Sequence, residues 1–115
     1  MGRVRAVIRR AEGRPQRGVI RVADLTLDPV TRAVRLDGRP VHLSAKEFAL
    51  LQELMRHPGE VLSRTHLIDH VWDFAYDGGS NVVDVYIRYL RDKVDRPFGK
   101  RSIETVWGVG YRLNP

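Results

Sequence analysis

The sequence predicts an α+β fold in which a four-stranded antiparallel N-terminal sheet is followed by three helices and a C-terminal β-hairpin. Segments with an apolar residue at every second position occupy residues 20–43. Apolar residues at helical spacing follow between residues 44 and 94, and an alternating pattern returns at 102–113. A chain of 115 residues has room for one hydrophobic core. We therefore expect one folded domain, residues 19–115, after a short N-terminal segment.

The composition excludes several classes of protein. The chain has no cysteine, so it cannot form a disulfide framework, a thiolate metal site or a thiol nucleophile. Its apolar runs are far shorter than the roughly 20 residues that a membrane span needs. The start, Met1-Gly-Arg-Val-Arg, lacks the apolar region of a signal peptide. We expect a cytoplasmic protein with no membrane partner.

The net charge of +6 is concentrated at the N-terminus. Residues 1–22 hold seven arginines against one glutamate, whereas residues 23–115 carry equal numbers of basic and acidic side chains. Within that neutral part, acidic residues dominate from Glu60 to Asp84 and basic residues from Tyr86 to Arg112. This separation of charge suggests two faces with two different partners.

Residues 1–18 are expected to be the end of an upstream domain followed by a flexible linker. The stretch Arg3–Glu12 has helical propensity, but it is short and is followed by Gly13, Pro15 and Gly18. A basic arm that contacts the phosphate backbone is the alternative interpretation.

The expected sheet consists of four short strands. Residues 20–22 and 25–27 alternate between apolar and polar side chains, and a turn at Asp28-Pro-Val-Thr follows them. Asp37-Gly38 is a hairpin turn signal between residues 33–36 and 39–43.

Two helices should follow the sheet. Ser44 and Glu47 form a capping box, and His57-Pro-Gly ends the first helix. Ser63 is the expected N-cap of the second. The inner faces are expected to consist of Phe48, Leu51, Leu54 and Met55 on the first helix and Leu67, Ile68, Val71 and Trp72 on the second.

His66 and His70 stand one helical turn apart, with Asp69 beside them. This spacing permits metal chelation, but two ligands without a third are weak evidence for a site. We therefore expect no metal ion and no other cofactor.

The third helix, within residues 80–94, has two different faces. Val83, Ile87, Leu90 and Val94 fall on one narrow stripe that should face the core. The opposite face carries an amide, guanidinium groups, a phenol and a small apolar side chain, which are groups that read base edges in a major groove. An ordinary amphipathic helix with two exposed apolar residues is the alternative.

The C-terminal residues 102–113 are expected to form a β-hairpin after the three helices. Residues 102–107 and 111–113 read as two strands joined by a turn at Gly108-Val-Gly110. A helix pair followed by a hairpin is a winged helix-turn-helix. In such folds the second helix of the pair enters the major groove and the hairpin tip lies along a neighbouring groove.

The sequence resembles the C-terminal DNA-binding effector domain of OmpR/PhoB-family response regulators over about residues 20–113. The matching stretches are Leu43-Ser-Ala-Lys-Glu-Phe-Ala-Leu-Leu51, Val61-Leu-Ser-Arg64, Leu67-Ile-Asp-His-Val-Trp72, Val83-Asp-Val-Tyr-Ile-Arg-Tyr-Leu-Arg91 and Ile103-Glu-Thr-Val-Trp-Gly-Val-Gly-Tyr-Arg112. Arg3–Arg10 also looks like the last turns of the receiver domain that precedes this effector domain in the family. The resemblance implies transcription regulation as the output of a two-component system.

The resemblance also implies which residues contact DNA. The positions that read bases in the family correspond to Asn81, Val82, Val85, Arg88 and Tyr89. The positions that contact the DNA backbone correspond to Arg64, Trp72, Tyr86 and Arg91. The minor-groove element corresponds to Thr105 through Trp107 at the wing. Some members carry arginine where this chain has Tyr89 and Trp107. We expect Trp107 to pack under the wing, because a large aromatic side chain is usually buried, and a contact of Trp107 with DNA is the alternative.

The connection between the second and third helices, residues 73–79, is acidic and aromatic. Its acids are repelled by phosphate, so we expect Asp73, Tyr76 and Asp77 to face another protein. The alternative is that Phe74 and Tyr76 fold back over the core. In the resembled family the corresponding loop contacts RNA polymerase, and binding to direct repeats as a dimer is a family expectation.

Two functions of different classes compete. The first is sequence-specific binding of double-stranded DNA, and the second is a winged-helix protein–protein module, which the neutral charge of residues 23–115 favours. The sequence shows no nucleophile–base pair and no phosphate-cradling glycine loop, so we expect no enzyme.

Overall fold

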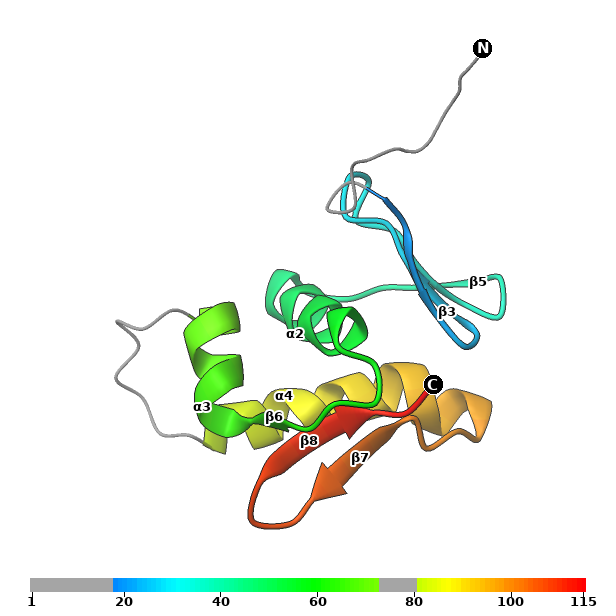
Figure 1. Cartoon of the computed structure of the whole chain (residues 1–115). Coiled ribbons are helices and arrows are strands. Elements are labelled where there is room, and N and C mark those ends of the chain that lie inside the picture. Colours follow the sequence, from blue (N-terminus) through cyan, green and yellow to red (C-terminus); the bar gives the residue numbers. More distant parts are fainter. Residues whose placement is uncertain (1–17, 73–80) are drawn as a thin grey trace.

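The structure of the protein is a computed structural model that describes residues 18–72 and 81–115 (Figure 1). The predicted flexible segment, residues 1–18, therefore lies outside the described residues except for Gly18. The described elements follow the predicted order of sheet, helices and hairpin. No helix among them combines the length and the hydrophobicity needed to cross a membrane.

The N-terminal sheet has the predicted four antiparallel strands, β2 (Ile20–Val22), β3 (Leu25–Leu27), β4 (Val34–Leu36) and β5 (Arg39–Val41), in sequence order. Asp37 and Gly38 join β4 to β5 with φ angles of 54° and 80°. Two consecutive positive φ angles are what a two-residue type I′ hairpin turn requires. The predicted hairpin signal is therefore confirmed.

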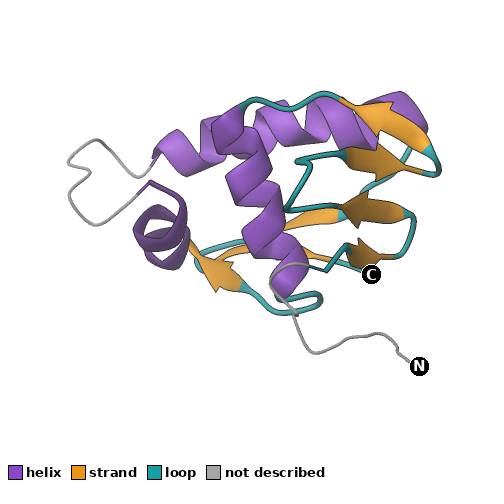
Figure 2. Ribbon diagram, turned by 90° about the horizontal axis from the view of Figure 1, so that it is seen from above, coloured by secondary structure: helices purple, strands orange, loops and turns teal. Residues whose placement is uncertain are grey.

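The first helix, α2 (Ala45–Arg56), begins at the predicted capping box. The Ser44 hydroxyl accepts from the Glu47 amide at 3.2 Å, and the Glu47 carboxylate accepts from the Ser44 amide at 2.8 Å. In Figure 1, α2 lies between the N-terminal sheet and α4 (Asn81–Leu90). Seen from above, α2 crosses α4 at a steep angle (Figure 2). This central position accounts for the complete burial of Leu50, Leu51 and Leu54.

The second helix consists of α3 (Arg64–Leu67) and a π-helical turn, η2 (Ile68–Trp72). Ser63 caps it as predicted, because its hydroxyl accepts from the His66 amide at 3.0 Å. The third helix, α4, continues into a second π-helical turn, η3 (Arg91–Asp95), and a 3₁₀ turn, η4 (Arg96–Phe98). The predicted core stripe of Val83, Ile87, Leu90 and Val94 is fully buried.

The wing is formed by β7 (Ile103–Val106) and β8 (Gly110–Leu113). A further strand, β6 (Leu62–Ser63), pairs with β8 and gives a three-stranded sheet in the order β6-β8-β7. The close approach requires glycine at position 110, since an added Cβ would lie 2.0 Å from the Leu62 carbonyl oxygen. The sequence predicted the β7–β8 hairpin but not β6.

Candidate nucleic-acid interface

The side of α4 opposite its buried stripe is the predicted recognition surface. Asn81 and Arg88 are exposed on it, and Tyr89 is 42% exposed. Val82 and Val85 are half-buried, and Val82 packs against the edge of the core. The helix therefore presents an amide, a guanidinium and a phenol outward from a rigid base.

Three aromatic rings connect this surface to η2. The Trp72 and Tyr86 ring centroids lie 5.3 Å apart in an edge-on arrangement. The Tyr86 and Tyr89 ring centroids are also 5.3 Å apart and edge-on. The Lys46 ammonium lies 5.9 Å from the Trp72 ring centroid and donates to the Val71 carbonyl at 2.9 Å. Edge-to-face packing of this kind restrains the rings. Trp72 and Tyr86, predicted as backbone contacts, thus also hold Tyr89 in position.

Three side chains, one each from α3, α4 and β8, are joined by hydrogen bonds. The Arg64 Nε atom lies 2.9 Å from Asp84 Oδ1, and the Tyr111 hydroxyl donates to the same carboxylate oxygen. The hydrogen bond to Asp84 raises the pKa of Arg64 above its ordinary value. Burial and then the hydrogen bond to Asp84 raise the pKa of Tyr111. Tyr111, which the sequence did not single out, is therefore a neutral donor that links the wing to α4.

Arg91 connects the end of α4 to the wing. Its guanidinium donates to the Ile103 carbonyl from Nε at 3.2 Å and from Nη2 at 3.0 Å, and to the Thr105 hydroxyl at 2.7 Å. Arg91 and Thr105 were predicted as separate DNA contacts, but they contact each other. Both side chains are half-buried. Their bonds fix the orientation of the wing relative to α4.

The wing tip differs from the prediction. Trp107 is 87% exposed, so the expectation that it packs under the wing is wrong. Tyr111 is buried beneath the wing sheet instead. Trp107 stands at the turn that extends beyond the core, next to Gly108 with its φ of 79°. Val109, 51% exposed, completes a small apolar tip.

The predicted protein-contact residues Asp73, Tyr76 and Asp77 lie outside the described residues. The other predicted site residues lie on α3, η2, α4, the first residue of η3 and the wing. Hydrogen bonds of Arg64 and Arg91 and the packed aromatic rings join these elements. Sequence reasoning missed the roles of Asp84 and Tyr111. Their partners are 20 or more residues away in the sequence, so no local pattern indicates the pairing.

Comparison with known proteins identifies close relatives. Residues 38–113 match the sequence model of the family described as transcriptional regulatory protein, C terminal. The chain is 50% identical over 111 residues to the transcriptional regulatory protein TcrA of Mycobacterium tuberculosis, covering 96% of this chain and 44% of TcrA. The chain thus spans about half the length of the curated relatives that it matches.

Solved structures share the fold. The DNA-binding domain of Klebsiella pneumoniae RstA in complex with the RstA box is 38% identical, with a TM-score of 0.75 over 84% of this chain and 97% of that one. The response regulator DrrB of Thermotoga maritima, described as an OmpR/PhoB homologue, is 34% identical, with a TM-score of 0.74 over 85% of this chain and 45% of that one.

Proposed function

The chain belongs to the OmpR/PhoB family of transcriptional regulatory proteins, and we propose on that basis that it is a sequence-specific DNA-binding output domain. RstA, whose DNA-binding domain has been solved in complex with the RstA box, supplies a structural parallel for this proposal. In this proposal α4 enters the major groove and the β7–β8 wing lies at the adjacent minor groove. Binding to chromosomal DNA requires that the protein act in the cytoplasm.

The observation that carries the proposal is the exposed face of α4. Arg88 and Tyr89 point away from a stripe whose members are fully buried, so the helix cannot turn them inward without losing its core. Arginine recognises guanine with two hydrogen bonds, and the Asn81 amide matches adenine. Val82 and Val85 offer apolar contacts to a thymine methyl group.

The surrounding residues have positioning roles in this proposal. Tyr86 and Trp72 hold Tyr89 at the groove, while Arg64 and Arg91 supply positive charge beside the phosphate backbone. The Arg91–Thr105 hydrogen bond keeps the wing at a fixed distance from α4. Trp107 at the wing tip is an apolar side chain of the kind that minor-groove proteins insert between base steps.

The longer relatives suggest further partners. The upstream residues 1–18 would connect to a receiver domain, since the matched relatives are about twice as long as this chain. Binding of two copies to direct repeats would place two α4 helices in successive major grooves. The acidic segment of residues 73–79 would contact RNA polymerase, and it would remain accessible because phosphate repels its carboxylates. We assign no catalytic role to the chain.

The test is selection of a preferred site from random duplexes, followed by binding of the Arg88→Ala variant. The loss of a base-reading arginine should cost about 1–3 kcal/mol of specific binding while thermal stability is unchanged. Arg35→Ala, an exposed arginine on β4, is the matched control and should bind normally. Unchanged binding by Arg88→Ala would contradict the groove assignment.

A protein–protein module is the second candidate, favoured by the zero net charge of residues 23–115. DNA binding through phosphates weakens steeply as salt rises, whereas a module without a DNA function would not be retained on duplex DNA at low salt. Failure of selection to enrich any site, together with no retention at low salt, would favour this candidate.

A further inference from the structure

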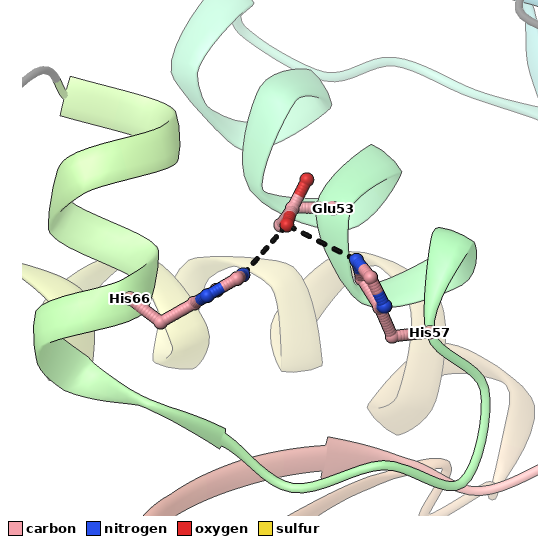
Figure 3. A group of neighbouring side chains, drawn as sticks. All are labelled: Glu53, His57 and His66. Atoms are coloured by element: carbon pink, nitrogen blue, oxygen red, sulfur yellow. Dashed lines mark hydrogen bonds and ion pairs between the residues drawn. The ribbon is translucent and has the colours of Figure 1, made fainter.

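We propose that Glu53, His57 and His66 form a binding site for a divalent metal ion of the zinc type. The three side chains converge from the end of α2 and the start of α3 (Figure 3). This group, called here the α2–α3 cluster, lies apart from the predicted recognition face of α4. Its occupancy does not depend on whether the chain binds DNA.

The geometry suits a small cation. One oxygen, Glu53 Oε2, lies 2.7 Å from His66 Nε2 and 3.3 Å from His57 Nε2. One possible ligand atom from each residue lies within 4.8 Å of the others. Ligand atoms bound to one tetrahedral zinc ion are about 3.3 Å apart, given bond lengths of about 2.0–2.1 Å. Small side-chain rotations would therefore open the cluster around an ion.

The chemistry of the donor set selects the class of metal. Two imidazole nitrogens and one carboxylate oxygen form a set that zinc binds in proteins, with the fourth position taken by water. Magnesium and calcium prefer an all-oxygen set. The chain has no cysteine, so the cluster lacks the thiolates that favour monovalent copper.

The surrounding groups orient the ligands. His57 Nδ1 faces Glu60 Oε1 at 3.8 Å, and a carboxylate at the distal nitrogen of a metal-binding histidine is a common supporting contact. The His70 ring stacks on the His66 ring at 4.0 Å between centroids, and its Nδ1 lies 2.8 Å from the His66 carbonyl. His70 therefore restrains His66 from the side and is not itself one of the three proposed ligands.

The burial of the Glu53 carboxylate favours binding of a cation in the α2–α3 cluster. The Glu53 side chain is only 8% exposed. Its nearby basic partner is Arg56, at 3.7 Å, on a side chain that is 48% exposed. A buried carboxylate is costly unless a positive charge compensates it, and a bound divalent ion would do so.

Metal binding would join α2 to α3 at a point distant in the sequence. Glu53 and His57 belong to the last turn of α2 and its C-cap, whereas His66 lies within α3. Since the unfolded chain holds no preformed site, the binding free energy adds to folding stability. The expected effect is a zinc-dependent rise in melting temperature.

The first experiment titrates zinc chloride into the tag-free, metal-depleted chain at pH 7.5 by calorimetry. We expect one ion per chain with a micromolar or lower Kd. His57→Gln and His66→Gln should each weaken binding by more than about ten-fold, because even loss of a supporting contact costs that much. His42→Gln, which changes an exposed histidine outside the cluster, is the control and should bind like the parent.

A second measurement needs no variant and so does not depend on the variants' folding. In NMR spectra of the parent chain, zinc should shift the imidazole signals of His57 and His66 and leave that of His42 unchanged. Binding should weaken at acidic pH, because imidazole must be neutral to bind a metal. The proposal is overturned if millimolar zinc shifts neither signal, or if the double variant of His57 and His66 binds zinc as tightly as the parent.

Discussion

Arg64 on α3 and Asp84 on α4 form an ion pair with 2.9 Å between Nε and Oδ1. The Tyr111 hydroxyl donates to the same carboxylate oxygen, so one acidic side chain joins both helices of the predicted pair to the wing. A carboxylate beside a DNA-reading helix would repel phosphate if it were alone. Its pairing with Arg64 removes much of that repulsion and orients the guanidinium.

The Asp84→Asn variant tests this arrangement. The amide keeps an acceptor for Tyr111 but loses the charge that holds Arg64. Stability should fall by no more than about 1 kcal/mol, because the two side chains are 29% and 43% exposed and solvent screens the pair. Affinity for unrelated duplexes should rise, since a negative charge is lost, and the ratio of specific to non-specific binding should fall.

Asp24→Asn is the matched control. Asp24 also forms an ion pair, with 2.6 Å between its Oδ2 atom and Lys100 Nζ, but neither residue belongs to α4. Fluorescence anisotropy on the selected site and on a scrambled duplex measures both affinities. A specificity ratio equal to that of the parent would rule out a positioning role for Asp84.

The buried stripe of α4 gives a prediction about stability. Leu90 is fully buried among the core residues. Leu90→Ala should therefore lower the free energy of unfolding by about 2–5 kcal/mol. Urea unfolding followed by circular dichroism measures the loss. Under conditions where the variant remains folded, its DNA affinity should approach that of the parent, because Leu90 faces away from the predicted recognition surface.

Features encoded by neighbouring residues were predictable. The Ser44–Glu47 capping box, the Asp37-Gly38 hairpin and the buried stripe of α4 each depend on spacings of one to four residues, and all three are present. Local hydrogen bonding and periodicity determine such features, so a single sequence reveals them. The family resemblance, carried by longer motifs, was also correct.

Features that depend on distant residues were not predictable. The pairing of Leu62 with Tyr111 in β6 and β8 brings together segments far apart in the chain. The same holds for the contact of His66 with Glu53, which lie 13 residues apart in the sequence. Trp107 was wrongly expected to be buried, because hydrophobicity alone does not say that the side chain lies in the turn beyond the last β7–β8 pair, Val106 and Gly110.

The pairing of Glu47 with Lys93 gives a prediction about pH. Burial by itself would raise the pKa of Glu47, but hydrogen bonds from Lys93 at 2.6 Å and from the Ser44 amide outweigh it and lower the pKa. A carboxyl whose pKa is lowered by folding contributes stability above its unfolded pKa of about 4.3. That contribution is lost as the pH falls through the folded pKa.

Glu47→Gln keeps the capping box, because glutamine also serves at this helix position. It should cost about 1–2 kcal/mol at pH 7, where the charged hydrogen bond to the 40%-exposed Lys93 is lost. The difference in unfolding free energy between parent and variant should shrink below about pH 4. A difference that stays constant from pH 7 to pH 3 would show that the charge of Glu47 contributes nothing.

The exposed wing tip gives a prediction about binding alone. Trp107 is 87% exposed, so Trp107→Ala removes almost no buried surface and should leave the melting temperature within error. If the indole inserts at the minor groove, the variant should bind the selected site about five-fold or more weakly, which corresponds to about 1 kcal/mol. Val109→Ala, at the same tip, should have a smaller effect because it removes a smaller side chain.

Tryptophan fluorescence can separate insertion from simple proximity of Trp107 to DNA. The chain has two tryptophans, so the signal of Trp107 is taken as the difference in emission between the parent and Trp107→Ala on the same duplex. An inserted indole leaves water and stacks on bases, so its emission should be quenched and become inaccessible to iodide on the selected duplex. Trp107 emission that stays unchanged and open to iodide, with normal affinity of Trp107→Ala, would exclude the wing tip from the interface. The wing would then act only through Arg91 and Thr105, whose hydrogen bond fixes its position beside α4.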